Sequence, residues 1–166
     1  TLEYAASCWD PHHQKDIDTL EAVQRKVARF ISNNFRRRTS VTALLTNLDL
    51  QPLQQRREAS RLSMLYKIHH NKVQIQIPDH FIGQGISTMK TRSRHEGRYH
   101  LIIPRTDTYK YSFYPRTIKL WNQLPLTTIM APTVKTFNTL VQQATTSLQT
   151  ELYMGSVPAA AGAPLN

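Results

Sequence analysis

A mainly helical fold is indicated by one stretch of the sequence, DIDTLEAVQRKVARFI (residues 16–31). Its apolar side chains recur every three or four residues, which is the period of an amphipathic helix. They are Ile17, Leu20, Val23, Val27, Phe30 and Ile31. The pattern predicts a helix that ends near Asn33, and a fold class that is mainly α.

The start of this helix is predicted from Asp10 and Pro11. An aspartate suits the N-cap position, and a proline suits the first helical position because its missing N–H would have no partner there. The acidic residues that follow favour the positive end of the helix dipole. We therefore expect His12 and His13 to lie in the first helical turn.

The same spacing predicts further helices downstream. Ser40 is a plausible cap for a short helix, and a second long helix begins near Pro52 and ends at the pair His69 and His70. The last helix covers roughly residues 133–148. The whole chain is expected to hold about four helices.

A small β-hairpin-like element is predicted after residue 98. Residues 99–103 and 109–114 are strand candidates, and in the second of them aromatic residues alternate with polar or basic ones. Pro115 ends the second candidate and starts a short helix that Pro125 stops. Phe113 and Trp121 are expected to belong to the core.

Composition divides the chain into four expected regions. They are a basic helical region (1–72), an extended arm and mobile loop (73–98), a strand and helix region that carries the motif PRTIKLWNQLP (99–148), and a disordered tail (149–166). The tail is assigned because residues beyond Gly155 are alanine, proline and glycine with almost no charge.

The charge balance points to a polyanionic partner. Among 166 residues there are 21 Lys and Arg against 11 Asp and Glu, which gives a net charge of +10 and an isoelectric point near 10.1. Nucleic acid is the usual partner of such a chain. A soluble domain that happens to be basic remains the alternative.

Two blocks hold the candidate phosphate-binding side chains. Arginine and lysine neutralise phosphates, and exposed tyrosines near the second block would stack on unpaired bases. For both blocks, phosphate contact and simple solvation remain open alternatives. The candidates are Arg25, Lys26, Arg29, Arg36, Arg37 and Arg38 in the first block, and Arg92, Arg94, Arg98, Arg105, Lys110 and Arg116 in the second.

No catalytic or metal site is predicted in this chain. No two acidic residues are adjacent, so the clustered carboxylates of two-metal phosphoryl transfer are missing, and no Gly-x-Ser-x-Gly turn positions a nucleophile. Cys8, His12 and His13 resemble zinc ligands, but a structural zinc site needs four ligands and the chain has one cysteine. No membrane-spanning run or signal peptide is readable.

Four blocks of sequence, in order, resemble the region that follows the polymerase domain in reverse transcriptases of non-LTR (LINE-type, Jockey-like) retrotransposons. They are LEYA with WDPH (2–5 and 9–12), VQRKVARF (23–30), RLSMLYKI (61–68) and YSFYPRTIKLWNQLP (111–125). The likeness covers roughly residues 2–140. Because the chain begins at Thr1, we also expect it to be a piece of a longer protein.

The resemblance implies a non-catalytic segment of an RNA-directed DNA polymerase. Such a segment would hold template RNA, nascent cDNA or nicked target DNA during target-primed reverse transcription, and magnesium would belong to the parent's polymerase domain. The expected partners are RNA, DNA and that polymerase domain, with the segment monomeric, off the membrane, and within intracellular ribonucleoprotein, both nuclear and cytoplasmic. The alternative is a structural or protein-interaction module, in which the apolar faces of the first and last helices are partner surfaces.

Overall fold

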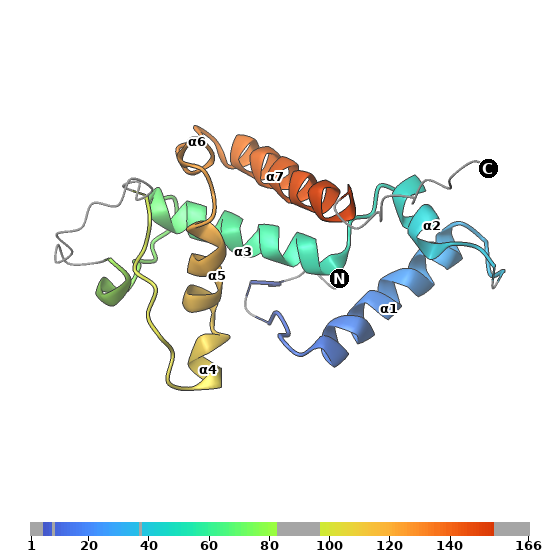
Figure 1. Cartoon of the computed structure of the whole chain (residues 1–166), viewed down its shortest axis with the longest axis horizontal. Coiled ribbons are helices and arrows are strands. Elements are labelled where there is room, and N and C mark those ends of the chain that lie inside the picture. Colours follow the sequence, from blue (N-terminus) through green and yellow to red (C-terminus); the bar gives the residue numbers. More distant parts are fainter. Residues whose placement is uncertain (1–4, 8, 37, 83–96, 155–166) are drawn as a thin grey trace, which may run out of the picture.

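A computed structural model of the chain describes residues 5–7, 9–36, 38–82 and 97–154, and these are mainly helical (Figure 1). No β-strand occurs within the described ranges. The helices are α1 (Gln14–Ile31), α2 (Val41–Asn47), α3 (Leu53–His69), the 3₁₀ turn η1 (Asp79–Phe81), α4 (Asp107–Lys110), α5 (Phe113–Trp121), α6 (Leu126–Ile129) and α7 (Val134–Met154).

Helix α3 is the centre of the molecule (Figure 1). It packs against α7 on one side and α5 on another, while its N-terminal part contacts α1, which in turn packs on α2. The core lies where α3, α5 and α7 meet, and in it the rings of Tyr66 and Phe137 stack at 4.4 Å. Trp121 of α5 is fully buried beside Phe137. This confirms the expectation for Trp121, whereas Phe113 is only partly buried at the edge of the core.

The predicted helices are present with small shifts in their bounds. Ser40 caps α2 as expected, because its Oγ accepts a hydrogen bond from the N–H of Ala43 at 3.4 Å. The predicted N-cap of α1 is wrong. His13 takes that position, and both histidines of the pair 12–13 precede the first turn. Asp10 instead turns inward, where its carboxylate pairs with arginines of α3 and α5.

The predicted hairpin after residue 98 is also wrong. Residues 107–110 form α4 and residue 113 already belongs to α5. Thr106 caps α4 through its Oγ1, which accepts from the N–H of Tyr109, and Ser112 is the N-cap of α5. The Thr106 cap starts α4, and the Ser112 hydroxyl donates to the Tyr109 carbonyl at 2.7 Å where the chain passes from α4 to α5. These local hydrogen bonds favour two short helices over the strand that the alternation of aromatic residues predicts.

The first strand candidate, residues 99–103, is extended but pairs with a side chain instead of a strand. Asn122 accepts from the N–H of Tyr99 at 3.0 Å and donates from Nδ2 to its carbonyl at 2.8 Å. The indole N–H of Trp121 donates to the Gly97 carbonyl at 2.8 Å. Residues 97–100 are therefore held on the C-terminal end of α5.

The predicted mobile loop and the predicted tail lie wholly or partly outside the described residues. Helix α7 continues past Leu148 to Met154, so residues 149–154, which were predicted as part of the tail, are helical. Residues 149–154 are good or moderate helix formers, and the first glycine, a common helix terminator, follows at position 155. The predicted mobile loop at 83–96 and the tail at 155–166 lie outside the described residues.

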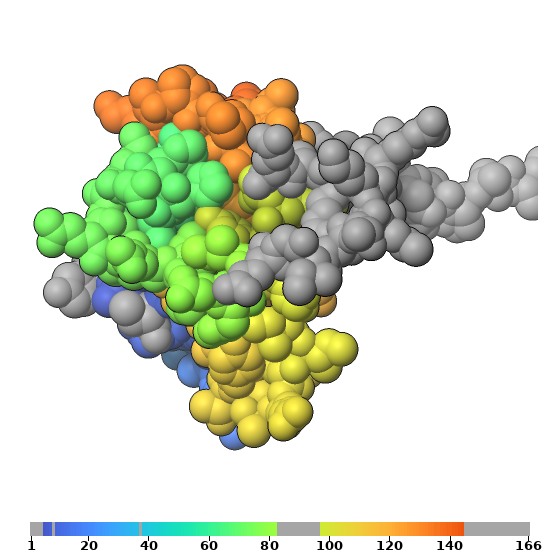
Figure 2. Space-filling model, turned by 90° about the vertical axis from the view of Figure 1, so that its left-hand side faces the viewer, coloured from blue at the N-terminus to red at the C-terminus, as the bar shows by residue number. Residues whose placement is uncertain are grey.

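Figure 2 looks at the end of the molecule away from α2, where three segments share one face. The end of α3 and the segment up to residue 82 (green) lie between the α6–α7 end (orange) and the region of α4 (yellow). The expected regions 1–72 and 99–148 thus contribute to one core. In the described part of the chain, no helix combines the length and apolarity needed to cross a bilayer.

Candidate nucleic-acid interface

The first predicted basic block gathers at the C-terminal end of α1. Arg25, Lys26, Arg36 and Arg38 are exposed, and Arg29 is half-buried. Arg25 and Arg29 are one helical turn apart, so they share a face of α1. The chain has no acidic residue between Glu21 and Asp49. We call the five side chains of this group the α1 basic surface.

The loop after α1 is folded back on the helix and carries part of this surface. The Arg29 guanidinium donates from Nη1 to the carbonyl of Arg36 at 3.0 Å. The Asn34 side chain accepts from the N–H of Arg36 and from the hydroxyl of Thr39. Asn33 has a φ of 45°, a left-handed conformation that asparagine tolerates and that turns the chain away from the helix. The cations of residues 36 and 38 are thus held near those of α1.

The second predicted block does not form one surface. Arg105 and Lys110 are exposed beside α4, at the end of the molecule away from α2 (Figure 1). The Lys110 ammonium lies 5.0 Å from the ring centroid of Tyr111. Arg98 is half-buried. Arg37, Arg92 and Arg94 lie outside the described residues.

Arg116 is a structural residue instead of a surface cation. Its Nη1 lies 3.1 Å from the Asp10 carboxylate and donates to the Asp10 carbonyl at 2.9 Å, and its Nη2 donates to the Pro11 carbonyl. These contacts occupy the guanidinium and dock the segment before α1 on α5. The guanidinium is thus engaged within the protein, and phosphate contact by Arg116 stays a prediction.

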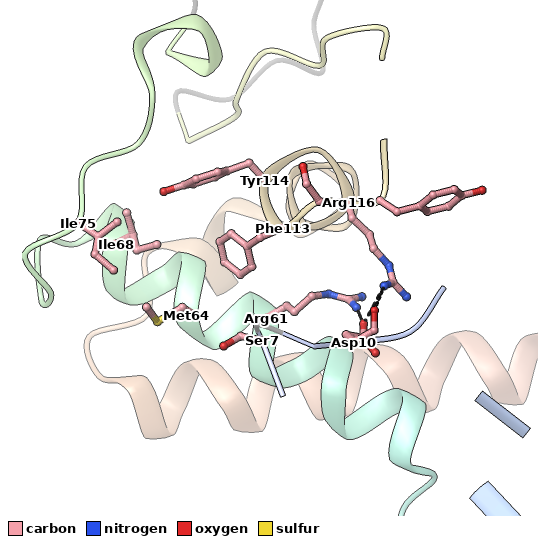
Figure 3. A pocket seen from close by; sticks show the side chains of 11 residues that line it. Ser7, Asp10, Arg61, Met64, Ile68, Ile75, Phe113, Tyr114 and Arg116 are labelled. Atoms are coloured by element: carbon pink, nitrogen blue, oxygen red, sulfur yellow. Dashed lines mark hydrogen bonds and ion pairs between the residues drawn. The ribbon is translucent and has the colours of Figure 1, made fainter. Parts of the chain in front are cut away.

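Asp10 collects two further arginines, both from α3. The Arg57 Nη1 lies 3.8 Å from the carboxylate, and Arg61 forms an ion pair with the other oxygen. The side chains of Asp10, Arg57 and Arg61 are each at least 93% buried. Figure 3 shows Arg61 and Arg116 converging on Asp10 from different helices. We call this group, Asp10 with Arg57, Arg61 and Arg116, the buried charge cluster.

The cluster carries more positive than negative charge, and burial is the main cause of the pKa shifts in and beside it. Burial, with the nearby charge of Arg116, lowers the pKa of Arg61 to about 10, and burial also lowers the pKa of Arg116. Burial raises the pKa of Glu58, while the charge of Arg116 opposes that shift. At neutral pH the arginines stay protonated. Asp10 is the carboxylate in contact with all three, and Glu58 places a second negative charge near Arg116.

A pocket of about 270 Å³ opens beside the cluster, between α3, α5 and the segment after α3 (Figure 3). Asp10, Arg61 and Arg116 form its polar end, and Met64 and Ile68 form part of its apolar wall. The pocket is also lined by Ser7, Ser112, Tyr111 and Tyr114. In the described residues no three His, Cys, Asp or Glu side chains group as metal ligands, and Cys8 lies outside them.

The two histidines at the end of α3 have structural partners. His70 Nε2 contacts the Ile129 carbonyl at 2.9 Å, and His69 Nδ1 is hydrogen-bonded to the hydroxyl of Tyr99. Burial, and then the neighbouring His70, lowers the pKa of His69. Burial, and then Tyr114, raises the pKa of Tyr99 to about 12, so its hydroxyl stays protonated.

The free energy of unfolding is expected to fall on mild acidification because of His69. At neutral pH the side chain is uncharged in both states. Below about pH 6.5 the unfolded chain takes up a proton that the folded chain resists, which favours unfolding. Urea unfolding at about pH 7.5 and about pH 5.5 measures this loss, which should be smaller in His69→Gln. The exposed His100→Gln is the control, and an equal loss in wild type and His69→Gln contradicts the assignment.

The exposed aromatic side chains are not where the sequence placed them. Tyr99, Tyr109 and Tyr114, near the second basic block, pack against the core. Phe30 and Phe35, at the α1 basic surface, are 75% and 64% exposed. The sequence contained a signal for this exposure, because Phe30 directly follows Arg29 and Phe35 directly precedes Arg36. The helical period places Phe30 on an apolar face of α1, but the period does not show whether another element covers that face.

No family model, curated protein or solved structure matches the chain.

Proposed function

We propose that the chain binds nucleic acid, without doing chemistry itself, through the α1 basic surface. The observation that carries the proposal is the set of five neighbouring cations, four of them exposed, on a stretch with no acidic residue. Side chains of this kind neutralise phosphates and release the counterions condensed on a nucleic acid. Such contacts carry no sequence information, so the binding is sequence-independent.

The four sequence blocks support a more specific form of this proposal. The chain is then a non-catalytic C-terminal segment of a retrotransposon RNA-directed DNA polymerase, and it holds template and primer or target DNA during target-primed reverse transcription. The parent's polymerase domain supplies the magnesium and the catalytic carboxylates. An intracellular ribonucleoprotein, nuclear and cytoplasmic, is the corresponding location.

Binding is tested by fluorescence anisotropy of a labelled RNA–DNA hybrid titrated with the purified chain. Five phosphate contacts predict a plot of log affinity against log salt concentration with a slope of about −4 to −5. Weak binding at low salt, or an affinity that does not change with salt, contradicts the proposal, because phosphate neutralisation must weaken as salt rises.

A protein-interaction module is the second candidate, and one observation favours it. Val23, Val27, Phe30 and Ile31 on α1 are 39–75% exposed, which leaves an apolar helix face uncovered. The last helix does not share this property, because Phe137 of α7 is buried in the core. Gel filtration discriminates between the candidates: a monomer that binds nucleic acid supports the first, and an oligomer indifferent to nucleic acid supports the second.

A further inference from the structure

The apolar face of α1 is uncovered because a different face of the helix is used for packing. Gln24 and Ala28 are the buried residues of α1. Gln24 donates from Nε2 to the Gln51 carbonyl at 3.0 Å and accepts from Arg56 Nη2 at 2.8 Å. One turn earlier, the Glu21 carboxylate accepts from the backbone N–H of Gln54 at 3.0 Å. The packing of α1 against α3 therefore includes these polar contacts on the face that carries Gln24.

Phe30 points away from that contact. It lies about 120° around the helix axis from Gln24, and it is 75% exposed. Phe35 follows in the loop that Arg29 and Asn34 fold back on the helix, and it is 64% exposed. Exposure of two phenyl rings to water costs free energy, so the binding of a partner that covers them is favourable.

Cations flank both phenylalanines in the sequence. Lys26 is one helical turn before Phe30, Arg29 is its neighbour in the chain, and Arg36 is the neighbour of Phe35. The partner must therefore combine negative charge with flat apolar surface. A second copy of this chain carries the same +10 charge and would be repelled. A nucleic-acid duplex offers phosphates but keeps its base faces stacked inside, and opening them costs a few kcal/mol per step.

We propose that the α1 basic surface is a single-strand site, in which unpaired bases stack on Phe30 and Phe35 while the surrounding cations bind the phosphates. Unpaired RNA or DNA presents both chemistries together, and base stacking tolerates any sequence because every base has a π-face. The inference rests on the proposed function and narrows it from nucleic acid in general to its unpaired form.

The test compares wild type with Phe30→Ala/Phe35→Ala on three labelled probes of mixed sequence: single-stranded RNA, single-stranded DNA and a blunt duplex. Loss of two stacking contacts is expected to weaken single-strand affinity at least about 25-fold, with duplex affinity unchanged. Both rings are exposed, so thermal unfolding should not change. The RNA and DNA arms show which strand is preferred.

A conservative variant separates stacking from plain apolar contact. Phe30→Leu/Phe35→Leu keeps apolar side chains but removes the flat rings, so it should lose most of the single-strand affinity that the alanine variant loses. Full retention of affinity in the leucine variant, or equal loss on duplex and single strand in the alanine variant, overturns the single-strand site and leaves the proposed function standing. Failure of wild type to bind any probe at low salt overturns both.

Discussion

Asp10→Ala is expected to lower the free energy of unfolding by about 3–5 kcal/mol, because removing one partner of a buried ion-pair group leaves uncompensated charge. Three arginines converge on this carboxylate, two from α3 and one from α5. Arg57 and Arg61 are 98% buried and cannot regain full hydration. The remaining positive charges would also repel one another, so the segment before α1 should detach from α3 and α5.

Urea unfolding followed by circular dichroism measures this effect. Asp18→Asn is the matched control, since Asp18 is an exposed acid on α1 and should change stability by less than about 0.5 kcal/mol. A double-mutant cycle with Arg61→Met adds a sharper criterion: Arg61→Met should cost less in the Asp10→Ala background than in wild type. Additive effects of the two substitutions would show that the ion pair is not formed.

Trp121→Ala is expected to cost about 3–5 kcal/mol through the cavity it leaves. The side chain extends from α5 and is fully buried against α7 and the end of α3. The ring centroids of His69 and Phe137 lie 5.3 Å and 5.9 Å from the ring centroid of Trp121. Its indole N–H also satisfies the Gly97 carbonyl, so the substitution frees the segment at residues 97–100 as well.

The chain's other tryptophan provides the comparison. Trp9 is 43% exposed and its ring faces the buried Arg57 guanidinium at 4.2 Å, a contact worth about 0.5–2 kcal/mol. Thermal and urea unfolding of Trp121→Ala and Trp9→Ala should therefore differ several-fold in their effect. Similar losses in the two variants would contradict the placement of Trp121 at the centre of the core.

The helices were predictable from the sequence because their signals are local. The period of residues 16–31 and the Ser40 cap each depend on neighbours within one or two turns. Asp10 was misread for the same reason. By local rules it is a good N-cap, but its carboxylate is claimed by arginines of α3 and α5, and Arg116 is 106 positions away in the chain. No local pattern carries that information.

The hairpin prediction failed where a side chain replaced a strand. Residues 99–103 have the composition of a strand, but the backbone groups of Tyr99 pair with the amide of Asn122. A side chain that imitates a strand edge leaves no periodic signal, so only the packed structure reveals it. The same limit applies to the basic residues. Arg57 and Arg61 are buried and Arg25 is exposed, but the sequence alone does not distinguish them.

The central claim is that the α1 basic surface, and not positive charge in general, holds nucleic acid. The most direct measurement is the salt slope of hybrid binding for Arg25→Gln/Lys26→Gln/Arg38→Gln beside a control of equal charge change. The control variant is Lys15→Gln/Lys119→Gln/Lys135→Gln, whose side chains are exposed elsewhere on α1, α5 and α7.

Each lost phosphate contact reduces the magnitude of the slope by about 1. We predict that the magnitude of the slope falls by about 3 in the surface variant, while the control variant keeps the wild-type slope. Equal slopes for the two variants would contradict it, because binding would then follow the total charge of the chain and not this surface.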